Sequence, residues 1–152
     1  MISEGSVAPD FTLQDDSGNS VSLSSFLGQR VVVYFYPKDD TPGCTTQACD
    51  LRDAAPQFDG LDAVVLGVSP DSVESHRKFR DKFDLNFPLL ADVDRAVAEA
   101  YGVWKEKKLY GRTFLGIERS TFVIGRDGVV LHALRKVKAK GHAERIAELL
   151  AD

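Results

Sequence analysis

The chain has 152 residues, of which 43% are hydrophobic and 28% are charged, an ordinary mix for a soluble globular protein with one domain spanning residues 1–152. The net charge of −4 and the pI of about 5.4 give no support to nucleic-acid binding by a basic surface. No apolar run approaches the roughly 20 residues that span a bilayer. The opening MISEGSVAPDF lacks the basic and apolar regions of a secretory signal. We therefore expect a cytoplasmic protein that binds neither nucleic acid nor membrane.

The beginning of the chain predicts a β-hairpin followed by a buried strand. Residues 11–13 and 21–23 flank a polar turn at residues 16–19, and residues 24–27 suit a helical turn. Residues 31–36 form an unbroken run of β-branched and aromatic side chains. Such a run is typical of a strand that is buried on both faces.

A helix is predicted next, and it carries both cysteines. Thr41 suits the N-cap, and Pro42 then falls at the first helical position, where its missing N–H is not needed. Apolar residues recur at helical spacing from Cys44 to Phe58, and Pro56 marks a kink or an early end. The pattern therefore places Cys44 in the first helical turn.

That position favours a chemical role for the thiol. Free N–H groups and the helix dipole stabilise an anion at a helix N-terminus, so a thiol there ionises more readily to the reactive thiolate. The other interpretation of Cys44 is a small buried hydrophobe, but Cys49 lies five residues later and a Thr-Pro-Gly sequence precedes Cys44. Two cysteines without a secretory signal indicate a redox or metal role in a reducing compartment. His76, His132 and His142 have no metal-ligand spacing, so we expect no metal.

The middle of the chain alternates strands and helices. Residues 63–68 and 88–91 predict strands, and residues 72–83 predict a helix that Asp71 caps. His76 is expected on the solvated face of that helix. Asp92 or Asp94 is expected to cap a further helix that runs through Tyr101 and ends at Gly102.

The end of the chain predicts a hairpin and a last helix. Residues 120–124 and 129–134 are expected to pair about the turn Arg126-Asp127-Gly128, and residues 141–150 form an amphipathic helix. The lysine-rich residues 105–108 and 135–140 are interpreted as solvated surface. Strands that alternate with helices, together with hairpins, predict an α/β fold with a mixed sheet.

The motif around Cys44 resembles that of a known family. Pro37-x-x-x-Thr41-x-x-Cys44 matches the active-site motif of the peroxiredoxins. The longer string YFYPKDDTPGCT, with Cys49 following, resembles the Q-type branch, also called bacterioferritin comigratory protein. The segments GSVAPDFTLQDDSGNSVSL, GVSPDSVESHRKF and GIERSTFVIGRDG look like the same family. The resemblance implies a thioredoxin-like fold with a mixed central sheet flanked by helices and an N-terminal β-hairpin.

The resemblance also implies a function, that of an atypical 2-Cys thiol peroxidase. Cys44 would attack hydrogen peroxide or an organic hydroperoxide and become a sulfenic acid, and Cys49 would resolve it as an intramolecular disulfide. Arg119 and the Thr41 hydroxyl would stabilise the reacting charge, and Pro37 would shield the sulfur. A thioredoxin-type dithiol would reduce the disulfide. No metal, flavin or haem is implied, and a monomer is expected because both sulfurs lie in one chain.

Two residues depart from the pattern of the branch, and two other functions stay open. Many Q-type members carry Glu at the position of Gln47 and Phe at that of Leu51. One alternative is a thioredoxin-like protein disulfide oxidoreductase, although C-x-x-C is absent. The other is a non-enzymatic redox sensor that uses Cys44 as a switch. The sequence does not give the preferred peroxide or the physiological reductant.

Overall fold

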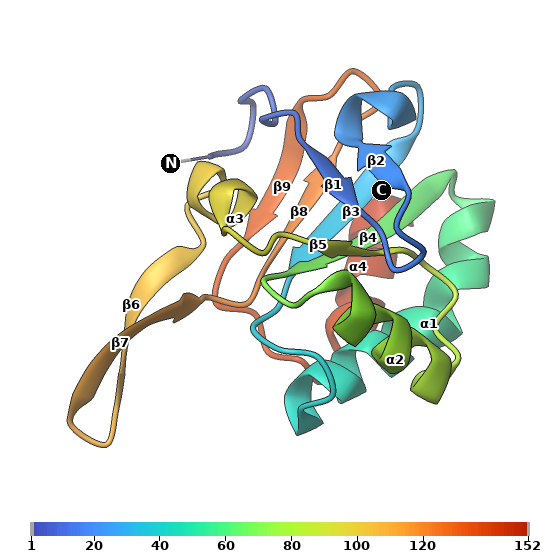
Figure 1. Ribbon diagram of the computed structural model, residues 1–152. Coiled ribbons are helices and arrows are strands. Elements are labelled where there is room, and N and C mark those ends of the chain that lie inside the picture. Colours follow the sequence, from blue (N-terminus) through green and yellow to red (C-terminus); the bar gives the residue numbers. More distant parts are fainter. Residues whose placement is uncertain (1, 152) are drawn as a thin grey trace.

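The structure, a computed structural model, describes residues 2–151. The strands are β1 (Thr12–Gln14), β2 (Ser20–Ser22), β3 (Arg30–Phe35), β4 (Ala63–Ser69), β5 (Leu89–Ala91), β6 (Trp104–Leu109), β7 (Arg112–Ile117), β8 (Ser120–Ile124) and β9 (Val130–Leu134). The helices are the 3-10 turn η1 (Leu23–Phe26), α1 (Pro42–Gly60), α2 (Val73–Phe83), α3 (Ala96–Ala100) and α4 (His142–Ala151). A seven-stranded sheet runs in the order β2-β1-β5-β4-β3-β8-β9, and β6 and β7 form a separate hairpin (Figure 1).

Strand β3 is the centre of the sheet. It pairs in parallel with β4, where Val32 faces Val65, and antiparallel with β8, where Val32 faces Val123. Residues 31–35 are all buried, as the unbroken apolar run predicts. Because β5 continues the parallel set and β8 the antiparallel one, the sheet is mixed. The predicted thioredoxin-like α/β fold is confirmed.

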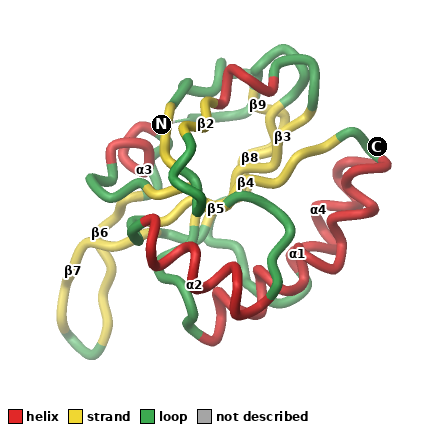
Figure 2. Tube along the Cα trace, turned by 45° about the vertical axis from the view of Figure 1, so that its right-hand side comes forward, coloured by secondary structure: helices red, strands yellow, loops and turns green. Residues whose placement is uncertain are grey.

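The two faces of the sheet bury separate cores. Helices α1, α2 and α4 cover one face (Figure 2). The core on that face contains Val32, Tyr34 and Tyr36. The short helix α3 and the amino-terminal segment cover the other face, which receives Val33 and Phe35. Helices α1 and α4 also pack against each other. Among residues 2–151, no helix is both long enough and apolar enough to cross a membrane.

Most predicted elements are present, with small changes at their ends. Helix α1 continues to Gly60 and does not stop at Pro56. Proline has no N–H to donate to the carbonyl of Arg52, but Asn86 Nδ2 donates to that oxygen at 3.2 Å. A side chain therefore replaces the missing helical hydrogen bond.

Two cap predictions have different outcomes. Asp71 does not cap α2: the N-cap is Ser72, whose Oγ accepts from Ser75 N at 3.1 Å. For α3 the N-cap residue is Arg95, not Asp92 or Asp94. Asp92 nevertheless accepts from the backbone N–H groups of Val97 and Ala98 at 3.1 and 2.8 Å, as a capping side chain does.

The β6–β7 hairpin was not predicted from the sequence. It extends from the body of the molecule (Figure 1), and Tyr110 at its tip is 94% exposed. Its turn is Tyr110-Gly111, and both residues have positive φ, at 52° and 75°. A hairpin with few buried side chains and no Asn-Gly or Asp-Gly turn gives little sequence signal.

Candidate active site

Cys44 lies in the first turn of α1, just beyond the carboxyl end of β3, as predicted. Its side chain is buried, with only 2% of the residue exposed. Sγ accepts a hydrogen bond from Arg119 Nη2 at 3.3 Å. The structure thus brings together Cys44 and Arg119, which are far apart in the sequence, and places a permanent positive charge against the sulfur.

Two hydrogen bonds and the absence of a side chain at Gly43 position Arg119. It follows β7 and precedes β8, and its carbonyl accepts from Val137 N at 3.0 Å. Its Nη1 donates to Gln47 Oε1 at 2.5 Å. Gly43 provides the room that the guanidinium needs, because a Cβ on Gly43 would lie 3.3 Å from Arg119 Nη2.

Gln47 is a site residue that the sequence marked only as a departure from the family pattern. It is fully buried and binds the guanidinium through a neutral amide. A neutral partner positions Arg119 without cancelling its charge, so the full charge faces Cys44. Its place at the third position after Cys44 puts it on the same side of the helix, and that spacing was the available signal.

Thr41 and Pro37 frame the start of α1. Thr41 is the N-cap residue, as predicted, but its hydroxyl donates to Lys38 O at 2.9 Å and caps no helical N–H. The first turn of α1 also holds no acidic residue. Pro37 follows the buried Tyr36 and is partly buried. The N–H groups of the first turn are therefore free of side-chain acceptors that would compete with an anion.

Cys49 lies on the same helix as Cys44, and the structure does not bring the two sulfurs together. Both cysteines are free thiols; Cys44 is buried, and Cys49 is partly exposed. Residues five apart on an α-helix are separated by about 7.5 Å along the axis and by about 140° around it. Their Cα atoms are then roughly 8–9 Å apart, whereas a disulfide needs about 4.4–6.8 Å.

A buried polar cluster, which we call the Asp39 cluster, holds the loop that leads to α1. Asp39 accepts from Tyr36 Oη at 2.5 Å and from Ser75 Oγ at 2.8 Å, and His76 Nδ1 lies 2.7 Å from its carboxylate. Asp39 N donates to Asp71 Oδ2 at 2.8 Å. Burial, together with the charge of Asp39, raises the pKa of Tyr36 well above its usual value, so its hydroxyl stays a donor. The cluster thus ties the loop to α2 and to the residues that follow β3 and β4.

His76 corrects a sequence prediction, because it is fully buried and not on the solvated face of α2. Its Nε2 lies 2.9 Å from Leu90 O, a carbonyl that only accepts, so Nε2 carries the hydrogen. Val73, His76, Phe79 and Phe83 recur at helical spacing, and this stripe could have shown that His76 faces the core.

The Asp39 cluster also contains a set of potential metal ligands. Within residues 2–151, the one group of three or more His, Cys, Asp and Glu side chains whose ligand atoms lie within 4.8 Å of one another is Asp39, Asp71 and His76. Their oxygen and nitrogen atoms already pair with protein donors and acceptors. Neither cysteine belongs to this group.

His142 forms a second buried polar pair near the site. His142 is the first residue of α4, and its Nε2 lies 2.7 Å from Oγ1 of Thr121 on β8. Burial, followed by the charges of Arg145 and Arg119, lowers the pKa of His142 to about 4. The ring is therefore neutral at pH 7 and shares a hydrogen bond with the Thr121 hydroxyl.

Comparison with known proteins agrees with this geometry. The family model described as AhpC/TSA family matches residues 5–133. The peroxiredoxin Bcp of Bacillus subtilis is 51% identical over 151 residues, covering 99% of this chain and 96% of that protein.

Solved structures give the same result. The bacterioferritin comigratory protein of Xanthomonas campestris, studied for its alkyl peroxide reduction activity, is 43% identical with a TM-score of 0.91, covering 99% of this chain and 96% of that one. A cysteine variant of PrxQ from Xylella fastidiosa is 39% identical with a TM-score of 0.95 and the same coverage. The chain therefore belongs to the AhpC/TSA family, among the peroxiredoxins of the Bcp and PrxQ type.

Proposed function

We propose that this protein is a thiol peroxidase that reduces hydrogen peroxide and organic hydroperoxides with Cys44. The observation that carries the proposal is the contact between Arg119 Nη2 and the buried Cys44 Sγ at 3.3 Å. The relative from Xanthomonas campestris, studied for alkyl peroxide reduction, supports an organic hydroperoxide as one substrate class.

In the first step, the Cys44 thiolate attacks the distal oxygen of ROOH. The S–O bond forms as the O–O bond breaks, and the leaving RO⁻ takes a proton to become ROH. The sulfur is oxidised to a sulfenic acid. Negative charge spreads over the sulfur and both oxygens in the transition state, and the Arg119 guanidinium and the uncapped N–H groups of α1 stabilise it. Thr41 would join them by turning its hydroxyl from Lys38 O toward the peroxide, and Pro37 shields the sulfur from water.

In the second step, the thiolate of Cys49 attacks the Cys44 sulfur. A disulfide forms and hydroxide leaves, taking a proton to become water. An external dithiol of the thioredoxin type then reduces the disulfide and is itself oxidised. Because one chain holds both cysteines, no second subunit is needed, and we propose that the protein works as a monomer.

The burial of Cys44 separates this function from a protein disulfide oxidoreductase. Only 2% of the residue is exposed, so a small peroxide reaches the sulfur far more easily than the disulfide of a folded protein does. A non-enzymatic sensor would react once and would not turn over with a dithiol.

Consumption of hydrogen peroxide and of an organic hydroperoxide, with and without thioredoxin, tests the proposal. Cys44→Ser should abolish consumption. Cys49→Ser should react once and accumulate sulfenic acid, which a sulfenic-acid trap and mass spectrometry detect. Wild-type turnover by Cys44→Ser would show that the peroxidase assignment is wrong. A dominant intermolecular disulfide on a non-reducing gel would count against the monomer.

A further inference from the structure

Two buried polar atoms close to Cys44 lack hydrogen-bond partners among the described residues. They are Tyr34 Oη on β3 and Gln47 Nε2 on α1. Tyr34 is 1% exposed and Gln47 is fully buried. The third such atom within residues 2–151, Arg30 Nε, lies at the opposite end of β3. The two unpartnered groups near the site thus lie where the first turns of α1 cover the sheet.

The orientation of Gln47 follows from its partner. Arg119 Nη1 has only N–H to offer, so the amide oxygen must face it and Nε2 must point elsewhere. Turning the amide over would place the Gln47 NH₂ group against an N–H group of Arg119. The contact that positions Arg119 therefore leaves Gln47 Nε2 without a partner.

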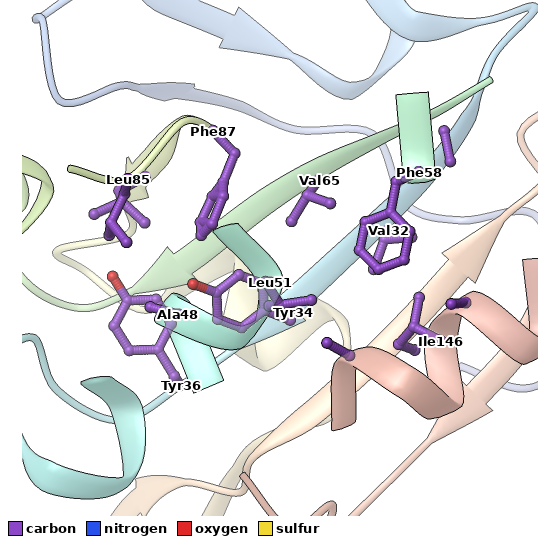
Figure 3. Close-up of a cluster of buried hydrophobic side chains, with 14 of the residues drawn as sticks. Val32, Tyr34, Tyr36, Ala48, Leu51, Phe58, Val65, Leu85, Phe87 and Ile146 are labelled. Atoms are coloured by element: carbon purple, nitrogen blue, oxygen red, sulfur yellow. The ribbon is translucent and has the colours of Figure 1, made fainter. Parts of the chain in front are cut away.

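Tyr34 Oη faces hydrocarbon. The ring stacks on Tyr36 at 5.3 Å and meets Phe87 edge-on at 5.9 Å between centroids. The hydroxyl fills the space that Gly67 leaves, since a Cβ on Gly67 would lie 2.9 Å from Oη. Leu51 and Ala48 of α1 belong to the same buried cluster as the ring (Figure 3).

The Tyr34 hydroxyl also keeps its proton. Burial first, and then the negative charges of Cys44 and Asp39, raise the pKa of Tyr34 well above its usual value. It is therefore a donor without an acceptor, and this is unfavourable only while α1 covers it.

A disulfide between Cys44 and Cys49 requires this part of α1 to open, because helical geometry keeps their Cα atoms too far apart. Opening carries Gln47 and Ala48 away from the sheet and lets water reach both unpartnered groups. We propose that Tyr34 is a positioning residue for the second step: its unpartnered hydroxyl destabilises the closed helix and sets how often residues 44–49 open. This inference rests on the proposed function, since it takes Cys49 to be the resolving cysteine.

Tyr34→Phe tests the inference, because it keeps the ring and removes only the hydroxyl. The closed helix becomes more stable, so the disulfide should form about tenfold more slowly, equivalent to about 1.4 kcal/mol. The sulfenic acid lives longer and should give more sulfinic acid at high peroxide. The rate of the first step should not change, since the closed form that attacks peroxide stays the same.

Tyr36→Phe is the matched control. Tyr36 lies two residues further along, just beyond the end of β3 and in the same core cluster, but its hydroxyl donates to Asp39 at 2.5 Å. Its removal should lower the stability of the protein and should not slow disulfide formation. A general effect of losing a tyrosine hydroxyl would appear in both variants.

The measurement is a rapid-quench experiment on the reduced protein with hydrogen peroxide, in which mass spectrometry counts sulfenic acid, disulfide and sulfinic acid. Hydrogen exchange at residues 44–49 of the reduced protein is measured beside it. Slower disulfide formation and about tenfold greater protection in Tyr34→Phe would support the inference. Wild-type values for both would overturn it.

The Cys49→Ser variant separates the two possible failures. If sulfenic acid decays in Cys49→Ser as in the wild type, the proposed role of Cys49 is wrong. In that case the hydrogen exchange of Tyr34→Phe still decides whether the hydroxyl favours opening, and unchanged protection contradicts it.

Discussion

The loop before α1 and the first turns of α1 are neighbours in the chain, but polar contacts hold them very differently. Asp39 in the loop is paired with Tyr36, Ser75 and His76, and its own N–H is paired with Asp71. In the first turns of α1, Gln47 binds Arg119, but its Nε2 and the Tyr34 hydroxyl beneath have no hydrogen-bond partner within residues 2–151. A fixed loop can present the site while a loosely held helix opens for the second cysteine. The hydrogen bonds of individual residues near Cys44 therefore determine which segment stays rigid and which can move.

Breaking the Asp39 cluster should have the largest effect. Asp39→Asn keeps the shape but places N–H donors against the donors that now face the carboxylate. The free energy of unfolding should fall by about 3 kcal/mol, as when a buried polar pair loses one partner. Urea unfolding of the reduced protein measures this change.

The neighbouring Asp40 supplies the control for that change. It is exposed and pairs with Lys82 at 2.8 Å on the surface, so Asp40→Asn should cost less than about 1 kcal/mol. Equal stabilities of Asp39→Asn and Asp40→Asn would show that the loop is not held by the Asp39 cluster.

Acid should weaken the other buried pair, Thr121–His142. The pKa of His142 is about 4 in the folded protein, against about 6.5 in an unfolded chain. Between pH 6.5 and pH 4, His142 binds a proton in the unfolded chain but not in the folded protein. The free energy of unfolding therefore falls as the pH drops through this range. Between pH 7.5 and pH 5 the loss from this group is about 2 kcal/mol. His142→Gln should remove that part of the pH dependence. His132→Gln, which changes a partly exposed histidine, should not. Identical pH profiles for the wild type and both variants would contradict this role of His142.

Removing the cation at the sulfur should slow the first step without opening the helix. Arg119→Ala should reduce the second-order rate with peroxide at least tenfold, about 1.4 kcal/mol, because the transition state loses its nearby positive charge. Stopped-flow peroxide kinetics measure this effect. Arg126→Ala, which removes a surface cation paired with Asp62, is the control. An unchanged rate in Arg119→Ala would refute the role of Arg119.

The smallest expected effect separates the position of Arg119 from the stability of α1. A Cβ on Gly43 would lie 3.3 Å from Arg119 Nη2, so Gly43→Ala should shift the guanidinium and slow the peroxide reaction about threefold, less than 1 kcal/mol. Stability should not fall, because alanine favours a helix more than glycine does. Gly60→Ala at the end of α1, where a Cβ meets nothing within 4 Å, should leave the rate unchanged. Equal rates for the two variants would show that Gly43 is not needed for Arg119.

The features that depend on local sequence pattern were predicted correctly. The buried strand β3, the helix start at Thr41 and Pro42, and Cys44 in the first turn all follow from residue type and spacing. The contact of Arg119 with Cys44 came from the family resemblance, since no local rule joins residues so far apart. The burial of His76 was missed although it shares a helical stripe with Phe79 and Phe83, whereas its contact with Asp39 in a separate loop follows from no local pattern.

The unpartnered Tyr34 hydroxyl could not be predicted for a related reason. A tyrosine in an apolar strand signals burial, but whether its hydroxyl finds a partner depends on the neighbouring strand and helix. Here the neighbour is Gly67, which offers space and no side-chain acceptor. Such features arise only from the packed structure.

Hydrogen exchange on the reduced and disulfide forms would show whether α1 opens while the loop before it stays fixed. The amides of residues 44–52 should lose protection when the Cys44–Cys49 disulfide forms, because that bond requires an open helix. The Asp39 amide, which donates to Asp71 at 2.8 Å, should keep its protection in both forms. Equal protection of residues 44–52 in the two forms, or loss of protection at Asp39 to the same degree, would contradict a fixed loop beside an opening helix.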